Sequence, residues 1–271
     1  MSVPNNHNSM YEIYIIGFKY ISHILNTGNM IFVITIITII ASVMLGNTEF
    51  ASFGNSQVQV NTTRLNPLPV LLIHGYNSDA SAWKKWEGLL KNDGIPFYPI
   101  TFKQSDDKCG SVIDHAKELN NIVQQIQNIT GSKQVNIVGH SKGGLDARVY
   151  LTYGTDAVAN LIMIGTPNDG SPIAEISDPC KPAVYDLRPG SNATKAKMNP
   201  HTKYYTIAGD WAPGIQGNPA IPGNDDGLVA VASVESQDYF KNLGHTSYRH
   251  EKLLEENDIY NLVQGILIAH K

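Results

Sequence analysis

The chain has 271 residues, of which 42% are hydrophobic and 16% are charged, and its formal net charge is −4. This content of apolar residues supports a packed core, so the composition excludes a chain that is disordered throughout. There is no block of basic residues that would neutralise phosphates, so we expect no binding of nucleic acid. The length fits one large domain or two small ones.

The first strongly apolar segment, residues 30–46, reads MIFVITIITIIASVMLG and contains no charged residue. It suits the apolar part of a signal peptide, and it reaches the short limit of a membrane-spanning helix. A cleaved signal and an uncleaved anchor are therefore both open, and a buried core helix is a third alternative. The first two place the following domain outside the cytoplasm, secreted or membrane-anchored. Met30 could also be the true start, which would leave residues 1–29 untranslated.

A polar linker is expected at residues 47–66, and from Pro67 onward strand and helix patterns alternate. Trp83 and Trp86 stand at helical spacing, which is more typical of a core than of a lipid-binding surface. Alternation of this kind predicts an α/β fold with a mostly parallel, doubly wound sheet of about six strands. In chain order we expect a strand at 70–73, a helix at 81–90, a strand at 97–102, a helix at 110–129, a strand at 134–138, a helix at 144–151, strands at 159–164 and 204–208, a further short strand within 228–234, and a helix at 258–269.

Residues 170–200 lack clear periodicity and contain five prolines. A segment of this length without regular structure of its own is usually functional. We expect it to form a cap or lid over an active site at the carboxyl ends of the strands, where parallel sheets bind their ligands.

The most informative stretch is Gly139-His140-Ser141-Lys142-Gly143, which reads G-x-S-x-G between a strand pattern and a helix pattern. A serine in that position lies on a sharp turn with its hydroxyl exposed. The flanking glycines are expected because a Cβ would collide with the neighbouring strand or helix. The N-terminus of the following helix offers N–H groups and a partial positive charge to an oxyanion. Ser141 is therefore the predicted nucleophile.

A serine nucleophile needs a base, normally a histidine that a carboxylate orients. In this kind of fold the acid and then the base follow the serine along the chain. Asp226 stands out as the acid because it lies in a loop beside an apolar run. His250, just before the closing helix, is the predicted base, and His245 is the alternative. His270 is dismissed because it lies next to the terminus.

These patterns together resemble the α/β-hydrolase superfamily, and within it the small lipases and esterases of lipase class 2 type. The resemblance spans about 200 residues from Pro67 onward, and Leu253 and Leu254 after His250 also fit it. Two leading antiparallel strands of larger hydrolases are expected to be missing, which leaves a minimal core. The segments that carry the resemblance are Leu72-Ile73-His74-Gly75-Tyr76, Gly139-His140-Ser141-Lys142-Gly143-Gly144, Gly165-Thr166-Pro167-Asn168-Asp169-Gly170-Ser171 and Asp226-Gly227-Leu228-Val229.

The resemblance implies an enzyme that hydrolyses carboxylic esters of lipids or small molecules through an acyl-enzyme intermediate. Ser141, His250 and Asp226 would form the triad, and the backbone N–H groups of Tyr76 and Lys142 would hold the oxyanion. No cofactor or metal is expected. Acyl transfer and hydrolysis of amides or thioesters are alternatives on the same triad. A non-catalytic binding domain is disfavoured because all three triad residues are present.

Some neighbouring residues receive other roles. His74 is expected to hold the oxyanion loop through its ring, and His140 to pack beside the nucleophile turn. Lys142 stands where related lipases often carry methionine or glutamine, and its charge could alter the preference for substrates. Asp225 could be a metal ligand, although a carboxylate in a loop is more often solvated.

Cys109 and Cys180 are the only cysteines of the chain. Each follows a predicted strand, so both are expected at the same edge of the sheet. An exported domain with two cysteines favours one disulfide. Two free buried thiols are the alternative.

Overall fold

The computed structural model describes residues 67–175, 180–212 and 217–269. The apolar segment 30–46, the linker 47–66 and His270 lie outside the described residues, and the expectations about them stay predictions. Among the helices in the three described ranges, none combines the length and the hydropathy needed to cross a bilayer.

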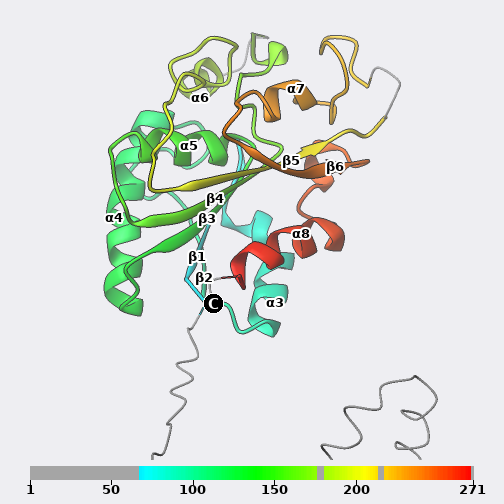
Figure 1. The fold of residues 1–271 in the computed structure, drawn as a ribbon. Coiled ribbons are helices and arrows are strands. Elements are labelled where there is room, and N and C mark those ends of the chain that lie inside the picture. Colours follow the sequence, from blue (N-terminus) through cyan, green and yellow to red (C-terminus); the bar gives the residue numbers. More distant parts are fainter. Residues whose placement is uncertain (1–66, 176–179, 213–216, 270–271) are drawn as a thin grey trace, which may run out of the picture. The chain divides into compact units, whose positions relative to one another are not determined.

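A single six-stranded sheet forms the centre of the fold, with the strand order β2-β1-β3-β4-β5-β6 (Figure 1). Every pair of neighbouring strands is parallel. The predicted α/β fold with a minimal parallel sheet is thus confirmed, and the sheet places the carboxyl ends of all its strands along one edge. The strands are β1 (Val70–Ile73), β2 (Phe97–Pro99), β3 (Val135–His140), β4 (Val158–Ile164), β5 (Lys203–Gly209) and β6 (Lys241–Thr246).

Helices cover both faces of this sheet. The helices α4 (Val112–Thr130) and α5 (Lys142–Leu151) lie on one face, and α3 (Lys84–Asn92) and α8 (Asn257–Leu267) lie on the other (Figure 1). Local sequence sets the ends of α4: the Ser111 hydroxyl accepts a hydrogen bond from the Asp114 N–H, and Gly131 ends the helix with φ of 70°. The shorter elements are η1 (Ala80–Trp83), η2 (Pro172–Glu175), α6 (Lys181–Asp186), α7 (Val231–Val234) and η3 (His250–Lys252).

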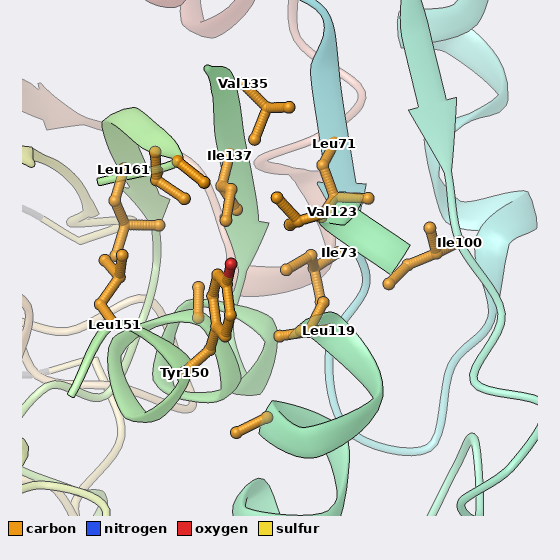
Figure 2. Packing of buried hydrophobic residues seen from close by; sticks show 14 of the residues in the cluster. Leu71, Ile73, Ile100, Leu119, Val123, Val135, Ile137, Tyr150, Leu151 and Leu161 are labelled. Carbon is orange, nitrogen blue, oxygen red and sulfur yellow. The ribbon is translucent and has the colours of Figure 1, made fainter. Parts of the chain in front are cut away.

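The core on the α4 and α5 side is built from apolar side chains of the sheet and of these two helices. Figure 2 shows Leu119 and Tyr150 of the helices facing Ile73 and Ile137 of the central strands. All four side chains are at most 1% exposed. Burial of a large apolar side chain contributes roughly 1.5–3 kcal/mol relative to exposure, so this layer fixes α5, and with it the turn at Ser141, to the sheet.

A second core fills the other face, between the sheet and α3 and α8. Trp83 and Trp86 are 0% exposed, so the expectation that they belong to the core is confirmed. The Trp86 Nε1–H donates a hydrogen bond to the Leu254 carbonyl at 3.1 Å. This bond ties α3 to the segment that follows His250.

Near the C-terminal end of the chain one predicted strand is absent and one strand was not predicted. No strand forms over 228–234: Ala230 makes only an isolated bridge with Asp225, and α7 follows at once. Its valines pack with Ala208 in a small separate cluster, which buries them without a ladder of hydrogen bonds. The last strand is instead β6, whose sequence KNLGHT is polar because it lies at the edge of the sheet and is mostly exposed.

Candidate active site

Ser141 occupies a strained turn between β3, which ends at His140, and α5, which begins at Lys142. Its φ is 53°, a value that costs a non-glycine residue roughly 1–3 kcal/mol and persists only where the surroundings enforce it. Here the backbone on both sides of Ser141 is packed so tightly that it holds this conformation. A Cβ on Gly139 would lie 2.6 Å from the Gly144 nitrogen, and one on Gly143 would lie 2.5 Å from the Ile73 carbonyl oxygen. The steric need for both glycines is as the sequence predicts.

His250 and Asp226 form a buried pair. The Nδ1–H of His250 donates to Oδ2 of Asp226 at 2.7 Å, and the backbone N–H of His250 donates to the Asp226 carbonyl at 2.9 Å. The second carboxylate oxygen, Oδ1, accepts the N–H groups of Leu228 at 3.0 Å and Val229 at 2.7 Å. These hydrogen bonds hold the carboxylate in place, so it can orient the ring of His250.

One cavity of about 770 Å³ brings three of the predicted site residues, Ser141, His250 and Tyr76, together. Ser141, His250, Gly75 and Tyr76 all line it. The cavity lies where β1 and β3 end, as expected for a parallel sheet. Its other walls are largely apolar and come partly from the 170–200 segment: they include Ile173, Ala174, Val184, Leu187, Leu228, Val229 and Leu254.

The structure places the alternative base, His245, elsewhere. His245 lies on β6 with a side chain that is 45% exposed, and its Nε2 contacts Glu235 Oε1 at 2.5 Å. It is not among the residues that line the cavity with Ser141. The geometry therefore favours His250 over His245.

His74 and His140 support the site from two sides. The buried ring of His74 reaches the Asp107 carboxylate with Nε2 at 2.8 Å, so it fixes the segment before Gly75 and Tyr76. The ring of His140 lies 4.8 Å from that of His250, and its Nε2–H donates to the His250 carbonyl at 3.2 Å. Removal from water and the neighbouring His250 lower the pKa of His140 to about 3, so it stays neutral beside the site.

The Lys142 side chain does not reach the cavity. It is 2% exposed, and its ammonium group bonds to Asp146 at 2.6 Å and lies 3.1 Å from His115 Nδ1. Its charge is therefore paired inside the protein and does not face the cavity, where a substrate would contact it. The spacing of Lys142 and Asp146, four residues apart on one helix, was a signal for this pair. Nothing in the sequence pattern indicated His115, which comes from α4.

Asp225 is 1% exposed, so the expectation of a solvated carboxylate was wrong. Its Oδ1 accepts hydrogen bonds from the backbone N–H groups of Asn218 at 3.1 Å and Gly227 at 2.7 Å. These bonds shape the loop that carries Asp226. In the part of the chain that the structure describes, no group of three or more His, Cys, Asp or Glu side chains could hold a metal ion.

Cys109 and Cys180 form a disulfide, with their Cα atoms 4.7 Å apart, so that prediction is confirmed. Cys180 immediately precedes α6, and the Ala183 N–H donates to the Cys109 carbonyl at 3.3 Å. The bridge therefore fixes the start of α6, one of the elements that line the cavity, to the loop before α4.

Comparison with curated proteins finds lipases. A triacylglycerol lipase of Burkholderia plantarii is 32% identical over 126 residues, which are 44% of this chain and 34% of the lipase. A triacylglycerol lipase of Pseudarthrobacter phenanthrenivorans is 33% identical over 115 residues, 40% of this chain and 35% of that protein. The chain thus spans about a third of the length of these relatives.

Solved structures show the same fold. The mature lipase of Bacillus licheniformis superposes with a TM-score of 0.59 at 23% identity, covering 75% of this chain and 93% of that one. The product of lin2722 from Listeria innocua gives a TM-score of 0.52 at 19% identity, over 76% and 95% of the two chains. Together with the six-stranded parallel sheet, these likenesses confirm the α/β-hydrolase fold. A family model described as palmitoyl protein thioesterase matches residues 69–211, just over half of the chain. The chain therefore belongs to the palmitoyl protein thioesterase family.

Proposed function

We propose that this protein is a serine hydrolase that cleaves carboxylic acyl esters through Ser141, His250 and Asp226. The observation that carries the proposal is a shared cavity. The strained Ser141 lines it together with His250, and His250 is bonded to a buried carboxylate that can orient it. The lipase relatives support the same class of reaction, although the chain matches only part of their length.

In the first step the Ser141 Oγ attacks the carbonyl carbon of the ester while His250 Nε2 takes the hydroxyl proton. Asp226 keeps the Nδ1–H of the ring pointed away from the serine and balances the positive charge that forms on the imidazole. Collapse of the tetrahedral intermediate breaks the bond to the alcohol oxygen. His250 returns its proton to that oxygen, and the acyl group stays on Ser141.

The oxyanion of the intermediate needs N–H donors that are already in place. The first is the backbone N–H of Lys142, at the start of α5, where the helix dipole also favours negative charge. The second is the N–H of Tyr76, which lines the cavity next to Gly75. Removing one such donor typically costs about 2.7–4 kcal/mol of transition-state stabilisation.

In the second step water attacks the acyl-enzyme, and His250 takes its proton. The tetrahedral intermediate then collapses, the proton passes to Ser141 Oγ, and the carboxylic acid leaves. The apolar wall of the cavity, with Val184 and Leu187 from the 170–200 segment, supports an acyl group as the part of the substrate bound there. We propose that this segment acts as the cap of the site.

Thioesters are the second candidate class of substrate, and the family to which the chain belongs favours them. The same triad and oxyanion donors serve both esters, because the tetrahedral intermediates differ only in the leaving atom. Hydrolysis of an acyl thioester and of the oxygen ester with the same acyl chain, measured side by side, would decide between the two classes.

The direct test is a screen of p-nitrophenyl esters of graded chain length, together with labelling of Ser141 by a fluorophosphonate. Ser141→Ala and His250→Ala should each lower activity on the order of 10⁴-fold or more, because the triad acts as a unit. His245→Ala is the matched control and should retain activity. Absence of turnover of every ester and thioester by the folded protein would overturn the proposal.

We also propose that the hydrolase domain works outside the cytoplasm. The apolar segment 30–46 supports export or anchoring, and the disulfide supports an oxidising compartment. Separating soluble, membrane and periplasmic or extracellular fractions of cells that express the full chain would test this. Recovery of the active protein only from the cytosol would contradict it.

A further inference from the structure

A buried cluster of three charged or titratable side chains lies directly behind the nucleophile turn. We call Lys142, Asp146 and His115 the lysine cluster. All three are at most 2% exposed. The Lys142 ammonium donates to Asp146 Oδ1 at 2.6 Å, and His115 Nδ1 lies 3.1 Å from both Lys142 Nζ and Asp146 Oδ2. Burial acts to raise the pKa of Asp146, but Lys142 and His115 outweigh it and hold that pKa below its ordinary value.

The cluster also extends to the elements around α5. The Nε2 of His115 lies 2.8 Å from the Asp106 carbonyl oxygen, so that nitrogen carries a hydrogen and donates it. The ring stacks on Phe102 with centroids 3.7 Å apart. His115 is thus held on two sides, and through Lys142 and Asp146 it holds the first turn of α5 against α4.

A contribution to the stability of the fold does not by itself explain the lysine cluster. Lys142 stands at the first position of α5, where the positive end of the helix dipole disfavours a cation. Its ammonium also loses hydration on burial, and a buried ion pair rarely stabilises a fold more than well-packed apolar side chains of similar volume would. What the cluster does supply is a fixed geometry for the residue that carries the first oxyanion donor.

The turn at Ser141 has to be held in place by residues outside the turn. Ser141 precedes α5 with φ of 53° and makes no side-chain hydrogen bond that caps the helix. A nucleophile cannot serve as a cap, because its hydroxyl must be available to the base. The first turn of α5 therefore lacks the usual anchor of a helix start.

We propose that Lys142 is a positioning residue of the oxyanion hole, its buried side chain fixing its own backbone N–H through Asp146 and His115. This inference rests on the proposed function, since it assigns a role within that site. The N–H bonds most strongly to the oxyanion of the transition state, so a small displacement lowers kcat and leaves KM largely unchanged. Displacements of about 1 Å in an active site cost up to about 100-fold in rate.

The test compares two variants of the full chain with the parent. The double variant Lys142→Met with Asp146→Leu removes both charges and keeps the volume, so it avoids an unpaired buried charge. Asp146→Asn keeps an acceptor for Lys142 and removes only the carboxylate charge. The matched control, Lys84→Met with Glu87→Leu, removes an ion pair with a separation of 3.6 Å on α3, where Lys84 is 85% exposed.

Each protein is first titrated with a fluorophosphonate, so that kcat is expressed per reactive serine. Affinity for an acyl trifluoromethyl ketone then reports on the oxyanion hole itself, because its adduct with serine carries an oxyanion. We expect kcat of the double variant to fall about 10- to 100-fold, ketone affinity to fall with it, and KM to stay within twofold. Asp146→Asn should change in the same direction by less, and the control should match the parent.

A purely structural cluster would change the melting temperature and the titratable fraction, but not kcat per reactive serine. An active parent with unchanged kcat and ketone affinity in the double variant would overturn this inference and leave the proposed function intact. If the double variant does not fold, unchanged kcat and ketone affinity in Asp146→Asn would overturn it equally. A parent that hydrolyses no ester or thioester would overturn the proposed function, and this inference with it.

Discussion

Gly75 and Ser141 are packed so closely that a Cβ on Gly75 would lie 2.9 Å from the Ser141 Cβ and 3.4 Å from its Oγ. The loop that carries Tyr76 and the turn that carries Ser141 are therefore in direct contact. Neither can move toward the other, and any side chain at position 75 must push them apart.

Gly75→Ala should therefore lower kcat by about 100-fold, because it shifts the nucleophile relative to the donors. It should also lower the free energy of unfolding by about 1–3 kcal/mol, as overpacking does in a tight site. Initial rates and urea unfolding would measure both. Gly88→Ala is the control: a Cβ there meets nothing within 4 Å, and alanine favours the helix. Full activity of Gly75→Ala would contradict this prediction, because it would show that the loop carrying Tyr76 can accommodate the added methyl group.

Asp226→Asn should lower kcat by about 10⁴-fold with little loss of stability. The amide oxygen can still accept the N–H groups of Leu228 and Val229, but the NH₂ group faces His250 Nδ1 and forces the wrong tautomer. Steady-state kinetics and thermal unfolding would separate the two effects. Asp225→Asn is the neighbouring control, and its kcat should stay within about tenfold of the parent. Equal loss in both variants would contradict the assigned roles.

His140 should make the fold sensitive to acid. Burial and His250 lower its pKa from the ordinary 6.5 to about 3, so the unfolded chain binds this proton more readily than the folded one. Its contribution to stability is complete above pH 6.5 and is lost as the pH falls from 6.5 toward 3. Urea unfolding at several pH values should therefore show a smaller acid loss in His140→Gln than in the parent. The exposed His201→Gln should behave like the parent, and identical profiles for all three proteins would refute the prediction.

Reduction of the disulfide should lower the free energy of unfolding by about 2–4 kcal/mol, because the bridge closes a loop between residues 71 positions apart. Urea unfolding with and without dithiothreitol measures this change. The variant Cys109→Ser with Cys180→Ser should match the reduced parent and should not respond to reductant. Two free thiols in the denatured, non-reduced protein would show that the bridge does not form.

The sequence allowed the fold class and the site to be predicted where local signals were strong. The runs in β1 and β4 are apolar on both faces, which marks central strands, and Ser141 stands between two glycines that the turn requires. Asp226 and His250 were predicted because, in this kind of fold, the acid and then the base follow the serine along the chain. The roles of these three residues stay predictions until the variants are measured.

The features that the sequence did not predict share one cause. Each depends on contacts between residues that lie far apart in the sequence. β6 is polar, and only its pairing with β5 makes it a strand. Residues 228–234 look like a strand, yet packing against Ala208 suffices to bury their valines. His115 joins Lys142 only because α4 packs beside α5, and no spacing within either helix reveals that contact.

The bridge between Cys109 and Cys180 bears on how the protein should be produced. The core around Leu71 and Ile137 contains no cysteine and can assemble in a reducing cell, whereas the wall that α6 gives to the cavity depends on a bond that forms only under oxidation. Material expressed in an ordinary bacterial cytosol would thus lack the bridge and the restraint that it places on the start of α6. Expression with export or in an oxidising host is therefore the sound source for every kinetic comparison.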